Sequence, residues 1–196
     1  MGNASLIRQQ GPQTTLTKKG RKQAQKMARH MKDLGLEVII ASPFSRAQST
    51  AHDLHDETGL PITTSELFIE RRRPHAQLAR KKIHPHSLFV QLQLALFSSK
   101  ATWRHSDEET PGELLLRANE ALDFIWKRPE STIAVVTHGR FMRALYADIV
   151  LGEGVTGKAY LSLTRKLHMR NTALMVATCT DGVWEVLAWN KDAAEL

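Results

Sequence analysis

The sequence predicts an α/β fold, a three-layer αβα sandwich with a mostly parallel central sheet and a C-terminal hairpin. Short apolar runs, typical of buried strands, alternate with longer segments whose apolar residues recur at helical spacing. The 196 residues suit a single domain with a sizeable core, and no internal repeat or low-complexity linker divides them. We therefore predict one domain over residues 1–196.

The first strand–helix unit is expected at residues 6–34. The run "LIR" at 6–8 is typical of a short buried strand that ends in Arg8. Thr17 can cap the following helix, because its hydroxyl can accept a backbone N–H of the first turn, and Gly35 can end it. The apolar face of this helix is formed by Ala24, Met27, Ala28, Met31 and Leu34.

A second unit is expected directly after the first. The run "EVIIAS" at 37–42 predicts a buried strand. Ser42 followed by proline predicts a cap and a first-turn proline, and the helix that they open ends at Gly59. The run "ITTSELF" at 62–68 predicts a weaker strand.

Residues 71–105 differ from the rest of the chain. They contain the runs "RRRP", "ARKK" and "HPHS", with prolines at 74 and 85. We interpret this stretch as a basic, partly helical insertion, with one helix at about 87–98.

The C-terminal half repeats the alternation of helix and strand. Thr110, Pro111 and Glu113 form a capping-box pattern for a helix that runs to about residue 127. The run "TIAVVT" at 132–137 is the clearest buried strand, and a helix follows at about 140–151. The runs "ALMVATC" and "VWEVLAW" flank "TDG" and predict a hairpin.

The net charge of +7 favours an anionic partner: a nucleic acid, an acidic membrane surface or a phosphorylated small molecule. The single cysteine, Cys179, cannot form a disulfide framework or a thiolate zinc site. No apolar run is long enough to span a membrane, and the N-terminus lacks the pattern of a secretory signal. We therefore expect a cytoplasmic protein without a membrane partner.

Three predicted strand ends carry residues that suit phosphate. Arg8 ends the first strand, Arg46 follows the second by about one helical turn, and His138 lies at the tip of the strand at 132–137, before a helix N-terminus. Ligands of open α/β sheets bind at the carboxyl ends of the strands. Because arginine side chains and helix-start amides both bind phosphate, the sequence predicts a phosphate site at this edge.

These stretches resemble the histidine phosphatases, the superfamily that includes the cofactor-dependent phosphoglycerate mutases. The resemblance extends from Leu6 to about Trp189. It implies a phosphoglycerate mutase-like fold and the hydrolysis of phosphomonoesters, with no metal and no cofactor. The stretches that carry it are "LTKKGRKQA" at 16–24, "SPFSRAQSTA" at 42–51, "LFIERRRP" at 67–74, "DEETPGELLLRANEAL" at 107–122, "THG" at 137–139 and "NTALMV" at 171–176.

The resemblance also implies roles for single residues. Arg8, Arg46, His138 and the Gly139 backbone would bind the phosphoryl group, and Glu70 would protonate the leaving oxygen. The nucleophile of the family is a histidine directly after the first arginine, and this chain has Gln9 there, or Gln10 if the loop is aligned one residue later. The lone pair of an amide nitrogen is delocalised into its carbonyl group, so Gln9 cannot act as the family's nucleophile.

The sequence therefore predicts a phosphate-binding site without its nucleophile, which is either a natural pseudophosphatase or an inactive form made by substitution. One alternative is an active phosphatase that uses another histidine. The candidates for that role are His30, His52, His55, His75, His84, His86 and His105.

Two further alternatives compete. The basic runs at 71–73 and 80–82 could contact nucleic acid, but aromatic residues make up only 6% and no base-stacking motif is present, so we do not expect this partner. The run "GEGVTGK" at 152–158 has the glycine and lysine spacing of a phosphate loop. It lacks the hydroxyl residue that should follow, because Ala159 is there instead.

Overall fold

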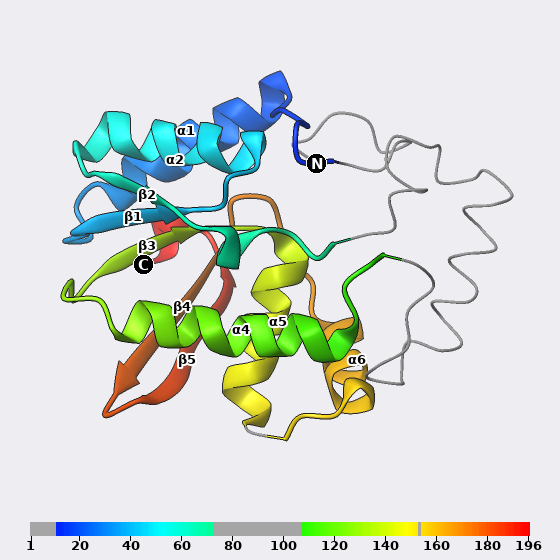
Figure 1. Cartoon of the computed structure of the whole chain (residues 1–196). Helices are drawn as coiled ribbons and strands as arrows, with labels where there is room; N and C mark the ends of the chain where they lie inside the picture. The colour runs from blue at the N-terminus through cyan, green and yellow to red at the C-terminus, as the bar shows by residue number, and fades with distance from the viewer. Residues whose placement is uncertain (1–10, 73–106, 153) are drawn as a thin grey trace, which may run out of the picture.

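The computed structural model describes residues 11–72, 107–152 and 154–196 (Figure 1). Before residue 73 the elements are α1 (Lys18–Met31), β1 (Val38–Ala41), α2 (Ser45–Thr58), β2 (Ile62–Thr64) and the 3-10 helix η1 (Glu66–Phe68). After residue 106 they are α4 (Pro111–Trp126), β3 (Ile133–Val136), α5 (Gly139–Leu151), α6 (Gly157–Lys166), β4 (Leu174–Thr180), β5 (Val183–Lys191) and the 3-10 helix η3 (Ala193–Glu195).

The central sheet is parallel, and its strand order in the described residues is β2-β1-β3. β1 is buried along its whole length, and its side chains alternate between two core clusters. Ile39 and Ala41 pack with α1 and α2, whereas Ile40 packs with α4 and α5. Figure 1 shows α1 and α2 on one side of this sheet and α4 and α5 on the other. The predicted αβα sandwich is therefore confirmed.

The helix boundaries follow the local capping signals of the sequence. Thr17 accepts the backbone N–H of Gly20 at 3.1 Å and starts α1. Both hydrogen bonds of the capping box between Thr110 and Glu113 are formed at the start of α4. α2 ends at Gly59, whose φ of 73° is a conformation that glycine adopts without strain. These boundaries confirm the predicted helices to within a few residues.

The expected cap of α2 was wrong. Ser42 continues the sheet instead, since its N–H donates to the Val136 carbonyl at 3.0 Å. α2 begins three residues later, with Phe44 as its N-cap. The 62–68 strand is also shorter than predicted, because β2 ends at Thr64 and η1 follows.

The strand with the clearest sequence signal, at 132–137, is present as β3 and is less buried than β1. Only Ala134 of β3 is fully buried, and the other three residues are partly exposed. In the described sheet β1 is the central strand and β3 lies at the edge.

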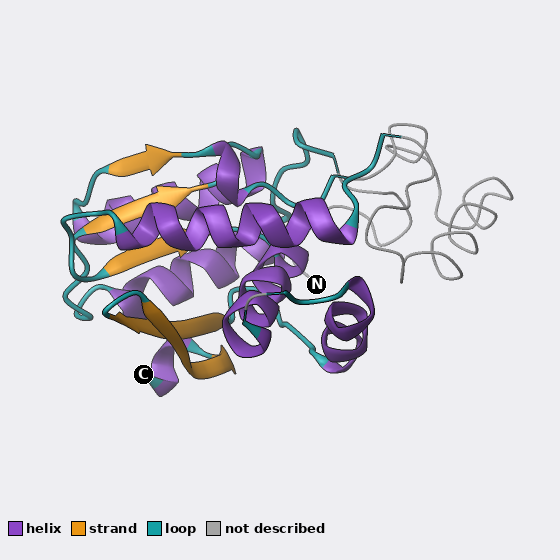
Figure 2. Cartoon of the chain, turned by 60° about the horizontal axis from the view of Figure 1, so that its bottom comes forward, coloured by secondary structure: helices purple, strands orange, loops and turns teal. Residues whose placement is uncertain are grey.

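The C-terminal hairpin is present and forms a two-stranded antiparallel sheet of its own in the described residues (Figure 2). Its turn is Asp181–Gly182, and both residues have positive φ angles, 52° and 80°. The hairpin packs on α5, where the rings of Tyr146 and Trp189 lie 4.8 Å apart. α6 was not expected from the sequence.

Some expectations fall outside the described residues. The predicted strand at 6–8 is one, and the greater part of the basic insertion at 71–105 is another. Among the helices that the structure describes, none has the length and apolar character needed to cross a membrane.

Candidate functional site

The carboxyl ends of β1 and β3 meet at one edge of the sheet, because the two strands pair in parallel. Ser42 follows β1 directly, and Arg46 is the second residue of α2. His138 is the N-cap of α5, two residues after β3 ends. Arg46 and His138 are each only 6% exposed. The parallel pairing thus brings these two predicted site residues together.

Arg46 holds the chain segment that precedes α1. Its Nη1 donates to the Gly11 carbonyl at 2.9 Å. Its guanidinium also lies 5.2 Å from the centre of the Phe44 ring. Burial lowers the pKa of Arg46, and the Glu70 carboxylate opposes this effect. A guanidinium has five N–H donors, so Arg46 can bind the Gly11 carbonyl and an anion at the same time.

His138 is a buried, neutral imidazole. Burial lowers its pKa to about 3, and the positive charges of Arg46 and Arg117 act in the same direction. Its Nε2 lies 2.8 Å from the Ser42 hydroxyl oxygen. Its ring contacts Phe44, with the ring centres 5.1 Å apart. At neutral pH this side chain therefore contributes a hydrogen-bonding group and no charge.

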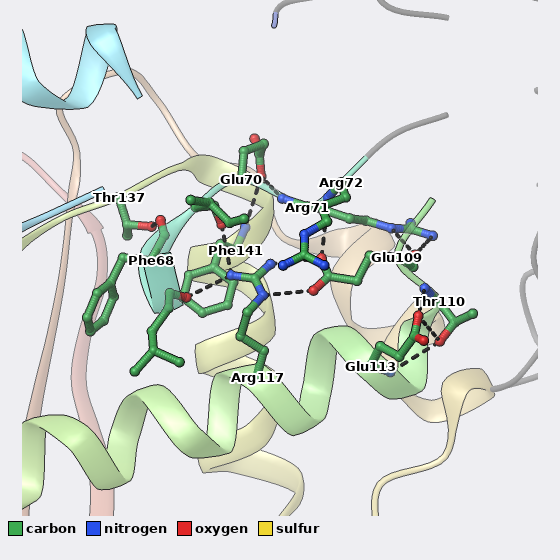
Figure 3. Close-up of polar contacts among 12 residues, drawn as sticks. Phe68, Glu70, Arg71, Arg72, Glu109, Thr110, Glu113, Arg117, Thr137 and Phe141 are labelled. Carbon is green, nitrogen blue, oxygen red and sulfur yellow. Dashed lines mark hydrogen bonds and ion pairs between the residues drawn. The ribbon is translucent and has the colours of Figure 1, made fainter. Parts of the chain in front are cut away.

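Glu70 lies just after η1, and its carboxylate faces the start of α5. Its Oε1 accepts the backbone N–H of Phe141 at 3.2 Å and that of Arg71 at 3.0 Å (Figure 3). A carboxylate at the start of a helix is stabilised by the positive end of the helix dipole. Glu70 is thus anchored beside the helix start that was expected to bind phosphate.

A cavity of about 1,320 Å³ joins these groups. Arg46, Glu70, His138 and Gly139 all line it. The cavity therefore holds a guanidinium, a carboxyl group and an imidazole beside a helix N-terminus. Together such groups can bind an anion and deliver a proton to it. Arg8 and Gln9, the remaining predicted site residues, lie outside the described residues.

Sequence reasoning missed a buried arginine that organises the Glu70 segment. Arg117 of α4 forms a bidentate ion pair with Glu109, with contacts of 2.7 and 2.8 Å. Its Nη1 donates to the carbonyls of Leu67 and Ile69, and its guanidinium lies 4.2 Å from the centre of the Phe141 ring (Figure 3). Arg117 therefore holds the backbone next to Glu70 and packs on the residue whose N–H binds Glu70.

A signal for Arg117 was present in the sequence. Leu114, Ala118 and Ala121 are buried on the apolar face of α4, and Arg117 falls on the same face. A single charged residue at such a position requires a buried partner. That partner is Glu109, whose backbone carbonyl also accepts two N–H groups of Arg71 at 3.2 Å.

The three described histidines that were candidates for a replacement nucleophile do not line the cavity. His30, His52 and His55 are exposed on α1 and α2 and do not line it. Nδ1 of His52 and Nδ1 of His55 each lie within hydrogen-bond distance of a backbone carbonyl. His75, His84, His86 and His105 lie outside the described residues. Within the described ranges, no group of three or more metal-ligating side chains is found.

The run "GEGVTGK" does not have the setting of a phosphate loop. The element before it is the helix α5, which ends at Gly152, and not a strand. Thr156 accepts the backbone N–H of Ala159 at 3.2 Å and caps α6. Lys158 is exposed. This stretch is a helix-to-helix connection.

The structure is thus an α/β fold in which Arg46, Glu70 and His138 line one cavity at the carboxyl edge of the sheet. The family model of the histidine phosphatase superfamily (branch 1) matches residues 1–192. The chain therefore belongs to the histidine phosphatase superfamily.

Its relatives in sequence carry the names of phosphoglycerate mutases or mutase-like proteins. A probable phosphoglycerate mutase GpmB from Erwinia tasmaniensis is 26% identical over 194 residues, which cover 98% of this chain and 86% of the relative. Phosphoglycerate mutase-like protein 1 of Arabidopsis thaliana is 28% identical, over 65% of this chain and 57% of the relative.

Solved structures share the fold. Bacillus stearothermophilus YhfR superposes with a TM-score of 0.80 at 21% identity, covering 94% of this chain and 89% of that one. A mycobacterial glucosyl-3-phosphoglycerate phosphatase gives a TM-score of 0.74 at 20% identity, with 94% and 91% coverage. A mutant phosphoserine phosphatase from Entamoeba histolytica, solved in complex with phosphoserine, gives 0.74 at 17% identity, with 97% and 91% coverage.

Proposed function

We propose that this chain is a phosphomonoester-binding protein of the histidine phosphatase family whose phosphatase-type site is impaired, because Gln9 stands where the nucleophilic histidine belongs. The observation that supports this most directly is the 2.9 Å bond from Arg46 to the Gly11 carbonyl. It holds the main chain two residues after Gln9 against a buried guanidinium, in the cavity that also contains His138.

The cavity supports a position for the predicted strand at 6–8. In the described sheet β3 is an edge strand, and the cavity runs along it between apolar residues of α1 and β4. A parallel strand paired with β3 there would end at the same edge as Ser42 and His138. Arg8 and Gln9 would then face Arg46. The apolar residues that line this part of the cavity include Met27, Met31, Ile133, Val135, Leu174 and Met175.

In this proposal the remaining groups keep the roles that the family assigns them. Arg8 and Arg46 bind the phosphoryl oxygens by paired N–H groups, and His138 and the Gly139 backbone donate to them. Glu70, held at the start of α5, supplies a proton to the leaving oxygen. Gln9 fills space and can hydrogen-bond, but it cannot form a covalent phosphoryl intermediate.

The names of the relatives suggest which phosphomonoesters to use first. They name phosphoglycerate, glucosyl-3-phosphoglycerate and phosphoserine, which are small phosphorylated acids. For such substrates the net charge of +7 would favour encounter at low salt. We take phosphoserine and phosphoglycerate as the first members of a test panel.

The test compares the parent protein with a Gln9→His variant on this panel. The variant should gain hydrolysis of at least one ester by about 1,000-fold or more, since loss of a nucleophile costs several orders of magnitude in rate. Gln10→His is the matched control and should stay as slow as the parent. A parent that is already fast, or a gain confined to Gln10→His, would contradict the role given to Gln9.

A further inference from the structure

Ser42 is a buried hydroxyl that the proposed function does not use. Its side chain is completely buried, although it borders the site. Its Oγ accepts the backbone N–H of Phe44 at 3.3 Å and lies 2.8 Å from Nε2 of His138. A buried hydroxyl carries one proton that needs an acceptor, because an unsatisfied buried donor costs about 1–3 kcal/mol.

Among the described residues, the acceptor within reach of the Ser42 proton is Nε2 of His138. Phe44 is a donor to the same oxygen and cannot accept. If Ser42 donates to Nε2, both Oγ and Nε2 are satisfied by one bond. If Nε2 carried the proton instead, two N–H groups would point at Oγ and the hydroxyl proton would lack that acceptor. The contacts therefore favour an unprotonated Nε2.

We propose that Ser42 is a positioning residue that fixes His138 in the tautomer whose proton is on Nδ1. The ring can then present an N–H donor to the cavity while it remains uncharged. The backbone N–H groups at the start of α5 are donors and cannot accept this proton, and the His138 side chain makes no capping bond to them. That the donor serves a phosphoryl oxygen rests on the proposed function, whereas the tautomer itself does not.

Two surrounding features support a neutral donor at this position. The low pKa of His138, about 3, means that the ring carries no proton beyond its single N–H near neutral pH. Arg46 already supplies a buried positive charge in the same cavity. A second cation would be repelled by it, whereas a neutral N–H adds a hydrogen bond without this repulsion.

The direct test is nitrogen NMR of the parent protein labelled with ¹⁵N-histidine at about pH 7. Long-range ¹H–¹⁵N correlations show which ring nitrogen bears the proton, and the signals of His138 are those missing from a His138→Asn variant. We expect Nδ1–H with a bare Nε2. Finding the proton on Nε2 in the parent would overturn the proposal, and this measurement needs no Ser42 variant to fold.

Substitutions then test the role of the hydroxyl. Ser42→Ala should shift His138 toward the Nε2–H tautomer and weaken inorganic phosphate binding about five- to ten-fold, the value of one lost hydrogen bond. Ser42→Thr keeps a hydroxyl and should keep Nδ1–H. The matched control is Ser49→Ala, because Ser49 donates only within α2, to the Ser45 carbonyl. An unchanged tautomer in folded Ser42→Ala would overturn the role of Ser42.

Phosphate binding separates this inference from the proposed function. A parent with Nδ1–H that binds no phosphate would support the tautomer assignment and count against the phosphomonoester site. A parent that binds phosphate with the proton on Nε2 would support the phosphomonoester site and contradict the tautomer assignment.

Discussion

His138 makes the stability of the molecule sensitive to acid. In the unfolded chain its pKa returns to the ordinary 6.5, whereas in the folded chain burial holds it at about 3. Between these values the unfolded state binds more protons, so the free energy of unfolding falls as the pH drops below 6.5. At about pH 4.5 the loss that His138 causes should be about 2–3 kcal/mol.

Urea unfolding of the parent and of His138→Asn at about pH 7 and about pH 4.5 checks this. The variant should lose less stability between the two pH values than the parent, by about 2 kcal/mol. Asparagine is also a favourable N-cap, so the start of α5 is retained. An equal loss in both proteins would show that His138 already carries a proton when folded.

The site residues that follow directly after parallel strands could be predicted, because the strand topology fixes their positions. Parallel strands end at the same sheet edge, so Arg46 and His138 could be assigned to one site from their places after strands. Ser42 was misassigned as a helix cap because its partner, His138, is 96 residues away. No local pattern reveals a hydrogen bond over that separation.

At the level of elements, the Arg117–Glu109 pair joins α4 to the segment that carries Glu70. Both side chains are at least nine-tenths buried. Arg117→Met should lower the free energy of unfolding by about 3–5 kcal/mol, because it leaves the Glu109 carboxylate buried without its partner. Chemical denaturation of the purified variant measures the loss.

The chain offers a matched control in Arg128. Arg128 also forms a bidentate pair, with Glu130, but its side chain is 26% exposed. Arg128→Met should have a much smaller effect than Arg117→Met. The double variant Arg117→Met, Glu109→Met should recover much of the loss, since it removes both buried charges. Equal losses for Arg117→Met and Arg128→Met would refute the stabilising role given to the buried Arg117–Glu109 pair.

The starts of α1 and α4 and the turn of the hairpin were predicted well, because their signals are local. Thr17, the capping box at Thr110 and the Asp181–Gly182 turn each act within four residues. α6 was missed because its cap, Thr156, lies in a glycine-rich stretch that suggested only a loop. The sheet order could not be predicted, because it depends on pairing between segments that are far apart in the sequence.

For the molecule as a whole, the cavity beside β3 predicts a structural role for the N-terminal segment. If the predicted strand at 6–8 pairs there, Ile7→Asp would bury a charge among apolar side chains. The free energy of unfolding should then fall by about 3 kcal/mol or more, and phosphate affinity should fall with it. Thermal denaturation and a phosphate titration of the variant check both effects.

Leu187→Asp is the control for this prediction. Leu187 is 60% exposed on β5, and its replacement should change stability by no more than about 0.5 kcal/mol. If Ile7→Asp were equally mild, the segment would not be part of the core, and Arg8 would have no strand to bring it to Arg46.

The hydrogen bonds of Glu109 have a further consequence for the architecture. Its N–H donates to the Arg72 carbonyl at 3.1 Å, and its carboxylate accepts the Arg72 N–H at 3.3 Å. Arg72 and Glu109, which lie on either side of residues 73–106 in the sequence, are therefore joined directly, and Arg117 holds Glu109 in the core. Because the two ends of the intervening sequence are held together by these bonds, its length can change at a small cost in loop entropy and without altering the sheet edge.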